Sequence, residues 1–257
     1  MGRTLSMGVC AMFTVSRLFS ATLLVCLLSP FGQAQTSLDD RLVLASPDVI
    51  AADPALTGHM NTLATAAITE HCAACHGADL TGRIGVPNLV DFDWNWGVTG
   101  YELTQAEGVF AIMQTILYGI RNTDCADDIK RYGACPDTRF SQMPGYGELG
   151  FTEAQLNGLV DFVLGLAGQP HDAAAAESVS NLIGLCAECH GDDSAGYKPF
   201  GGPDLTDDVW LYGDSREQVY DVIANGRVGI CPAWSTTISP AEVKAIALTI
   251  YQQSMGY

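Results

Sequence analysis

The chain has 257 residues, and its 12 Lys and Arg residues stand against 29 Asp and Glu residues, giving a formal net charge of −17 at pH 7. This acidity disfavours nucleic acid and anionic membrane surfaces as partners, whereas it favours a basic docking patch on a protein partner or serves solubility alone. The length allows one large domain or two domains of ordinary size.

The first 34 residues predict a signal for export. They contain no Asp or Glu, carry Arg3 and Arg17, and run apolar over 18–28 before a small-x-small site that ends at Ala34. These features are typical of a secretory signal peptide, so we expect residues 1–34 to be cleaved near Ala34 and the protein to be periplasmic. The apolar run is short for a membrane span, and an uncleaved N-terminus that anchors the chain in a membrane is the alternative.

Residues 35–60 are polar and rich in Ala and Pro, which predicts a linker with short helical turns. A helical pattern follows and leads into the pentapeptide Cys-Ala-Ala-Cys-His, which recurs later as Cys-Ala-Glu-Cys-His. The two copies consist of Cys72, Cys75 and His76, and of Cys186, Cys189 and His190.

Two thiols three positions apart, with a histidine directly after the second, form the attachment pattern of c-type haem. The sulfurs add to the porphyrin vinyl groups, and the imidazole becomes the proximal ligand of the iron. A redox or zinc-binding CxxC with an incidental histidine is the alternative for each copy. Two copies in one exported chain predict two covalently bound haem c groups, with His76 and His190 as proximal ligands.

The motifs belong to a longer internal repeat. Residues 87–97 align with 203–213 at an offset of 116, with Pro, Leu, Asp, Trp, an aromatic residue and Gly in register. Each half then predicts a helix that ends at a glycine and a closing helix that starts with a capping box. The repeat predicts an all-α fold of two tandem cytochrome c-type haem domains, at 61–168 and 179–257, joined by a linker at 169–178.

A proximal histidine leaves a second axial position on each iron, and electron carriers usually fill it with a methionine sulfur. Met143 is the candidate in the first half. At the corresponding place the second half has Cys231, which as a thiolate ligand would lower the redox potential. A thiol beside a five-coordinate haem and a disulfide partner are the alternatives for Cys231. The sequence leaves open whether each distal residue serves the haem of its own half.

Two further cysteines, Cys125 and Cys135, lie in an insertion that only the first half carries. In an oxidising compartment they are expected to form a disulfide that holds this loop. A pair of metal-binding thiols is the alternative.

The chain resembles the FixP or CcoP family, the dihaem cytochrome c subunit of cbb-type cytochrome c oxidases. The specific segments are Ile50-Ala-Ala-Asp-Pro54, Cys72-Ala-Ala-Cys-His-Gly77, Arg139-Phe-Ser-Gln-Met-Pro144, Leu205-Thr-Asp-Asp-Val-Trp-Leu-Tyr-Gly213 and Asn225-Gly-Arg-Val-Gly-Ile-Cys-Pro-Ala-Trp234. The resemblance implies two tandem cytochrome c folds that relay electrons to a terminal acceptor, with a membrane oxidase or reductase complex as candidate partner. It also implies that His76 and His190 are proximal ligands and Met143 a distal ligand.

The chain departs from that family in having a signal peptide in place of a membrane helix, Cys231 in place of a methionine, and the extra loop. We therefore expect a paralogue that carries electrons between redox proteins of a periplasmic respiratory chain, without substrate chemistry of its own. A subunit of a cbb-type oxidase is one alternative. The other is a sulfur-oxidising dihaem enzyme similar to thiosulfate dehydrogenase, in which Cys231 binds the substrate and Arg227 clamps its anionic group.

Overall fold

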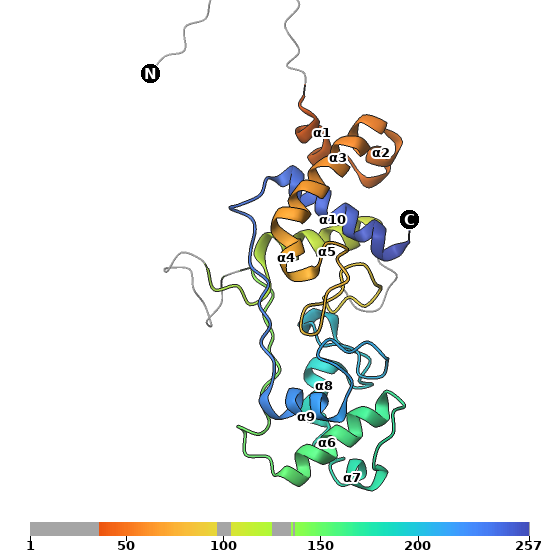
Figure 1. Ribbon diagram of the computed structural model, residues 1–257, viewed down its shortest axis with the longest axis vertical. Helices are drawn as coiled ribbons and strands as arrows, with labels where there is room; N and C mark the ends of the chain where they lie inside the picture. Colours follow the sequence, from red (N-terminus) through yellow and green to blue (C-terminus); the bar gives the residue numbers. More distant parts are fainter. Residues whose placement is uncertain (1–35, 97–103, 125–134, 136, 257) are drawn as a thin grey trace, which may run out of the picture. The chain divides into compact units, whose positions relative to one another are not determined.

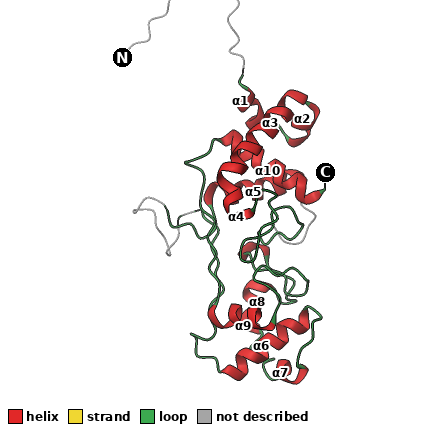
Figure 2. Cartoon of the chain, viewed as in Figure 1, coloured by secondary structure: helices red, strands yellow, loops and turns green. Residues whose placement is uncertain are grey.

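The computed structural model describes residues 36–96, 104–124, 135 and 137–256, and Thr36–Tyr257 form one compact unit. Within these residues the chain consists of helices, loops and isolated β-bridges, without a strand (Figures 1 and 2). The prediction of an all-α fold is confirmed for this part of the chain. Among the same residues, helices that combine the length and the apolar character needed to cross a membrane are absent.

The stretch 35–60, which was expected to be a linker with short helical turns, is largely helical. It contains α1 (Leu38–Leu44), α2 (Pro47–Ala52) and the first part of α3 (Pro54–Ala67). Each helix has an N-cap residue whose side-chain oxygen accepts a hydrogen bond from a backbone N–H of the first turn. The three caps are Ser37, Ser46 and Asp53. The side chains of Leu42, Ile50 and Leu56 are at most 2% exposed. This stretch is therefore part of a hydrophobic core, which polar composition alone did not indicate.

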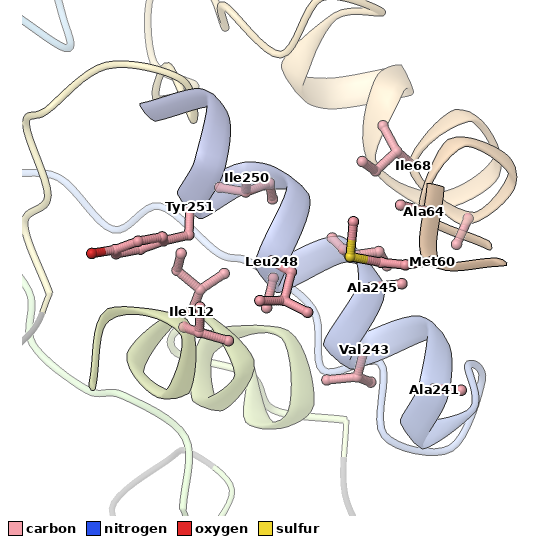
Figure 3. Close-up of a cluster of buried hydrophobic side chains, with 14 of the residues drawn as sticks. Met60, Ala64, Ile68, Ile112, Ala241, Val243, Ala245, Leu248, Ile250 and Tyr251 are labelled. Atoms are coloured by element: carbon pink, nitrogen blue, oxygen red, sulfur yellow. The ribbon is translucent and has the colours of Figure 1, made fainter. Parts of the chain in front are cut away.

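We call the group of α1, α2, α3, α5 (Gln105–Tyr118) and α10 (Pro240–Met255) the first cluster. The helix α10 packs against α3 on one side and α5 on the other, and Figure 3 shows Met60 and Ile112 on either side of Leu248. The contact between α5 and α10 is tight, because a Cβ atom at Gly108 would lie 2.3 Å from the ring of Tyr251. The C-terminal helix thus covers the helices that precede and follow the first Cys-x-x-Cys-His motif.

The second cluster consists of α6 (Glu153–Leu166), α7 (Ala173–Glu177) and α9 (Arg216–Asn225), and α8 (Gly184–His190) carries the second motif beside it. The helix α6 packs against α7 and α9. Asp161 of α6, whose side chain is 3% exposed, accepts hydrogen bonds from Arg216 at 2.6 Å and from the backbone N–H of Asp172 at 3.0 Å. The segment 169–178, which was expected to be a linker, therefore contains a helix that is packed onto α6.

Each cluster takes its closing helix from the other half of the sequence repeat. The helix α6 follows the first motif in the chain but packs in the second cluster, whereas α10 follows the second motif but packs in the first. The sequence predicted both closing helices and their capping boxes, and both boxes are present. It did not reveal the exchange. The predicted boundaries at 61–168 and 179–257 follow the repeat, and the helix packing groups the chain differently.

Two extended segments, 139–147 and 226–234, carry the chain between the clusters and run side by side in opposite directions (Figure 1). Backbone hydrogen bonds join Ile120 to Cys231 at 2.9 and 3.1 Å, and Met143 to Arg227 at 3.1 and 3.0 Å. We call these two segments, together with Ile120 and the backbone hydrogen bonds just described, the crossover. The crossover joins residues that are distant in the sequence. It therefore determines which segments of the two halves contact each other.

Candidate haem sites

The two motif histidines have the same hydrogen-bond geometry. His76 ends α4 (Ala73–His76) and His190 ends α8, and each is followed by a glycine with φ near +83°, Gly77 at +83° and Gly191 at +82°. The Nδ1 atom of His76 lies 2.9 Å from the carbonyl oxygen of Pro87, and that of His190 lies 2.8 Å from the carbonyl oxygen of Pro203. A carbonyl can only accept, so Nδ1 carries the proton and Nε2 is the nitrogen that can bind a metal.

Burial lowers the pKa of both imidazoles, so both are neutral at pH 7, the form that coordinates iron. The motif cysteines, Cys72, Cys75, Cys186 and Cys189, are not paired in disulfides. Burial raises the pKa of Cys72, Cys186 and Cys189. Each motif therefore presents two cysteine thiols that are free of disulfides and one imidazole nitrogen, the set that thioether attachment and proximal ligation of a haem require.

The crossover places Cys231 beside the first motif. Its sulfur is within electrostatic range of Cys72 and Cys75, and burial raises the pKa of its thiol to about 11. Three residues further on, the ring of Trp234 lies 5.0 Å from the ring of His71, which precedes the motif, and Trp234 packs on the first cluster. The residue from the second half thus faces the motif of the first half.

Met143, which belongs to the first half of the sequence, shows the reverse arrangement. Its side chain packs on the second cluster. Three residues further on, the Tyr146 hydroxyl lies close to the thiol of Cys186 in the second motif, and burial, followed by the nearby thiols, raises the pKa of Tyr146 to about 12. The backbone N–H of Tyr146 also donates to the carbonyl oxygen of Ile223 in α9 at 3.0 Å. Met143 therefore lies with the second cluster, although it follows the first motif in the sequence.

Met143 and Cys231 occupy equivalent backbone positions in the two sites. Gly119, after α5, has φ of +71°, and a Cβ atom there would lie 2.4 Å from the carbonyl oxygen of Cys231. Gly226, after α9, has φ of +69°, and a Cβ atom there would lie 2.4 Å from the carbonyl oxygen of Met143. In each site a helix thus ends at a left-handed glycine against the Cys-Pro or Met-Pro segment of the other half.

Two tryptophans supply a test of whether haem fits these sites. Among the described residues, the buried side-chain atoms without a hydrogen-bond partner are Trp94 Nε1, Asn95 Oδ1, Trp210 Nε1 and Thr249 Oγ1. Trp94 and Trp210 are equivalent in the repeat, and they pack on the first and the second cluster respectively. A buried N–H without an acceptor costs about 1–3 kcal/mol, so both indoles need an acceptor. The propionates of a haem are such acceptors, and the residues present therefore fit the group.

Sequence reasoning found the motifs and both sulfur residues, but it missed the roles of Trp94, Trp210 and Tyr146. For the tryptophans a signal was available, because they recur at the same offset of the repeat as the surrounding Pro, Leu and Asp residues. Tyr146 and Trp234 likewise stand three residues after Met143 and Cys231, but nothing in the sequence shows that the crossover brings Tyr146 to the second motif.

Arg227, considered above as an anion clamp beside Cys231, is engaged elsewhere. Its guanidinium forms an ion pair with Asp221 of α9 and lies 5.0 Å from the ring of Tyr212, while its backbone pairs with Met143. Arg227 is therefore held on the side of the second site, whereas Cys231 faces the first motif. This position does not support a role for Arg227 as an anion clamp beside Cys231.

Two expectations concern residues outside the described part of the chain. The signal peptide at 1–34 is one of them. The other is the disulfide between Cys125 and Cys135, since Cys125 is not described. Cys135 itself donates its backbone N–H to the carbonyl oxygen of Asn122 at 2.8 Å, at the start of the loop. Both expectations stay predictions.

The chain is similar in sequence to proteins of a known family. Residues 173–248 match the family described as cytochrome c oxidase, cbb3-type, subunit III. The chain is 34% identical to the cbb3-type cytochrome c oxidase subunit CcoP of Cereibacter sphaeroides over 226 residues, which are 87% of this chain and 71% of the relative. It is 35% identical to subunit FixP of a Bradyrhizobium species over 220 residues, 84% and 68% of the two chains. It is 33% identical to CcoP of Rhodobacter capsulatus over 240 residues, 89% and 73%.

Proposed function

This chain belongs to the CcoP and FixP family of cbb3-type cytochrome c oxidase subunits, and we propose on that basis that it is a dihaem electron relay serving a terminal oxidase of this type. Membership gives the coarser part of this statement: the chain is a cytochrome c with covalently bound haem c and a role in electron transfer. The number of haems, their ligands, the partner and the compartment are the proposal.

The observation that carries the proposal is the duplication of a complete site. Each motif contains a histidine whose Nε2 can bind a metal. Beside each motif lie Cys231 or Met143, which belongs to the crossover, and a tryptophan whose indole N–H needs an acceptor. A bound haem would supply an iron that takes up and releases one electron by cycling between its ferric and ferrous states. The polypeptide would fix the iron's ligands and shield the porphyrin from water, which are the tasks that a protein performs for such a cofactor.

We propose crosswise distal positions for the two haems. Cys72, Cys75 and His76 would hold the first haem, with Cys231 on its distal side. Cys186, Cys189 and His190 would hold the second haem, with Met143 as distal ligand. The contacts of Cys231 with the first motif, and of Met143 and Tyr146 with the second cluster and Cys186, support this assignment.

The oxidase is the proposed acceptor because the relatives' names describe subunits of cbb3-type oxidases. The predicted signal peptide favours a periplasmic location, and the charge of −17 suits a donor with a basic docking patch. A sulfur-oxidising activity receives no support, since Arg227 is held by Asp221 on the side of the other site.

The test begins with haem content. The tagged chain is produced in its full length in a host competent in cytochrome c maturation, and haem is counted by intact mass and by pyridine haemochrome. We expect two haems per chain. Cys72→Ala with Cys75→Ala, and Cys186→Ala with Cys189→Ala, should each leave one haem. Fewer than two haems in the unmodified chain would refute the proposal.

The second step concerns the acceptor. In membranes that contain a cbb3-type oxidase, the reduced protein should be reoxidised in an oxygen-dependent reaction. Co-purification of the catalytic subunit would indicate a bound subunit, and reoxidation without co-purification a mobile carrier. Reoxidation at the same slow rate with and without the oxidase would exclude the oxidase as acceptor.

A further inference from the structure

The first site differs from the second in the residue that the crossover delivers. Cys231 takes the backbone position that Met143 takes in the second site, against the left-handed glycine that ends a helix. Cys231 is half-buried, forms no disulfide, and lies near the two thiols of the first motif. The buried indole N–H of Trp94, without an acceptor among the described residues, independently indicates a ligand in the same cluster.

The charge beside the two sulfurs also differs. Arg121 follows Ile120, which pairs with Cys231, and its guanidinium interacts electrostatically with the cysteine. The guanidinium is fixed there because Nε donates to the carbonyl oxygen of Gly229 and Nη1 to that of Ser141. At the corresponding place beside Met143, the residue that follows Arg227 is the apolar Val228. A fixed cation thus lies beside Cys231, although burial acts more strongly on this thiol and raises its pKa, whereas the cation that pairs with Met143, Arg227, is engaged in an ion pair with Asp221.

We propose that Cys231 is the distal ligand of the first haem and binds its iron as a thiolate, so that the two haems have different ligand sets. This inference rests on the proposed function, because it requires a haem on the first motif. In the ligation step the thiol loses its proton to water and a sulfur–iron bond forms, without a change in oxidation state. An anionic sulfur stabilises ferric over ferrous iron more than a thioether does. The first haem therefore has the lower potential, and electrons that reach it pass downhill to the second haem.

The experiment uses the purified full-length protein with both haems. Electron paramagnetic resonance of the ferric protein and a redox titration are compared for the unmodified chain, Cys231→Met, Cys231→Ala and, as the matched control, Met143→Ala. We expect a thiolate-type low-spin signal that is lost in both Cys231 variants. Cys231→Met should also raise the potential of one haem and leave the other unchanged. Met143→Ala should keep the thiolate signal and alter the other haem.

The haem that Cys231 serves is identified by removing one haem at a time. The thiolate signal should disappear with Cys72→Ala and Cys75→Ala, and it should persist with Cys186→Ala and Cys189→Ala. The reverse result would place Cys231 on the second haem and overturn the assignment.

Near-infrared magnetic circular dichroism of the unmodified protein keeps the inference testable if a Cys231 variant does not mature. A ferric thiolate band would support thiolate ligation, and its absence would refute it. Two bound haems without any thiolate signal would leave the proposed function in place and remove this inference alone. Fewer than two haems would refute the proposed function itself.

Discussion

Trp94 and Trp210 link the sequence repeat to the chemistry of the sites. Both bury an indole N–H without an acceptor among the described residues, and each packs on one cluster. If each donates to a haem propionate, the hydrogen bond offsets part of the negative charge near the iron. Loss of that donor should favour the ferric state, because the propionate charge is then less compensated.

We therefore expect Trp94→Phe to lower the potential of the first haem alone, and Trp210→Phe that of the second alone. Each fall should be some tens of millivolts, below the ~59 mV that corresponds to a tenfold change for one electron. Redox titrations of the two variants check this, with each variant serving as the control for the other. Unchanged potentials in both would mean that the indoles have another acceptor.

Asp93 is a second residue with an unusual environment. Burial raises its pKa to about 6, and the carboxylates of Asp207, Asp91 and Asp204 act in the same direction, while Lys198 opposes them. Because the folded-state pKa lies above the ordinary value of 3.8 for Asp, this group favours folding most at low pH. Its contribution is lost as the pH rises through about 6.

Asp93→Asn removes the charge but keeps the shape, so it should stabilise the protein above the raised pKa. We expect a gain of about 1 kcal/mol at pH 8, reduced by solvent screening, and little or no gain at pH 4. Denaturant unfolding at the two pH values checks this. Asp221→Asn serves as a control at an exposed carboxylate with a lowered pKa, where Arg227 donates a hydrogen bond, and it should not stabilise at pH 8. A gain for Asp93→Asn that does not depend on pH would contradict the electrostatic cause.

Among the helices, the two closing helices show what a local pattern can and cannot predict. Both α6 and α10 begin with a capping box and have one apolar face, and the sequence predicted both features. Their partners were not predictable, because either amphipathic helix suits either hydrophobic cluster. The choice is made by the crossover, through bonds such as the one from Ile120 N to Cys231 O, between residues that no local pattern connects.

The exchange of helices predicts which haem each helix affects. Leu248 of α10 is 1% exposed in the first cluster, and Leu159 of α6 is 3% exposed in the second. Leu→Ala at either position should cost about 2–5 kcal/mol of unfolding free energy, because it leaves a cavity. Leu248→Ala should disturb the spectrum of the first haem and Leu159→Ala that of the second.

Nuclear magnetic resonance of the haem methyl groups in the ferric protein distinguishes the two outcomes. The two leucine variants are matched, because they make the same substitution at equally buried sites. If Leu159→Ala altered the first haem and Leu248→Ala the second, the closing helices would follow the sequence halves and the crossed packing would be wrong.

At the scale of the whole molecule, the features that the sequence predicts are those that depend on short segments. The haem motifs, the capping boxes and the positions of Met143 and Cys231 follow from a few neighbouring residues. The helices of 35–60 were predicted only as short helical turns of a linker, because Pro47 and Pro54 at helix starts resemble the prolines of a linker. The exchange of the closing helices was not predicted, and the haem that each distal residue serves was left open, because a repeat has the same sequence whether its halves pack separately or exchange parts. Contacts such as that of Gly119 with Cys231 decide between these arrangements.

The crossover makes the two halves depend on each other. A fragment of residues 36–168 keeps the first motif but lacks α10, which packs on α3 and α5. It would also expose the apolar face of α6 that α9 covers in the complete chain. Because one or two such losses remove most of a small domain's stability, the fragment should mature poorly on its own.

Co-expression with a fragment of residues 169–257 should restore a complex that carries both haems, since the missing helix then returns from the second chain. Haem yield and the cooperativity of unfolding, measured for each fragment alone and for the pair, check this. A fragment of 36–168 that binds one haem, unfolds cooperatively and gains nothing from its partner would show that each half folds independently. In that case α10 would not be required for the first haem, and the assignment of Cys231 to that haem would lose its structural basis.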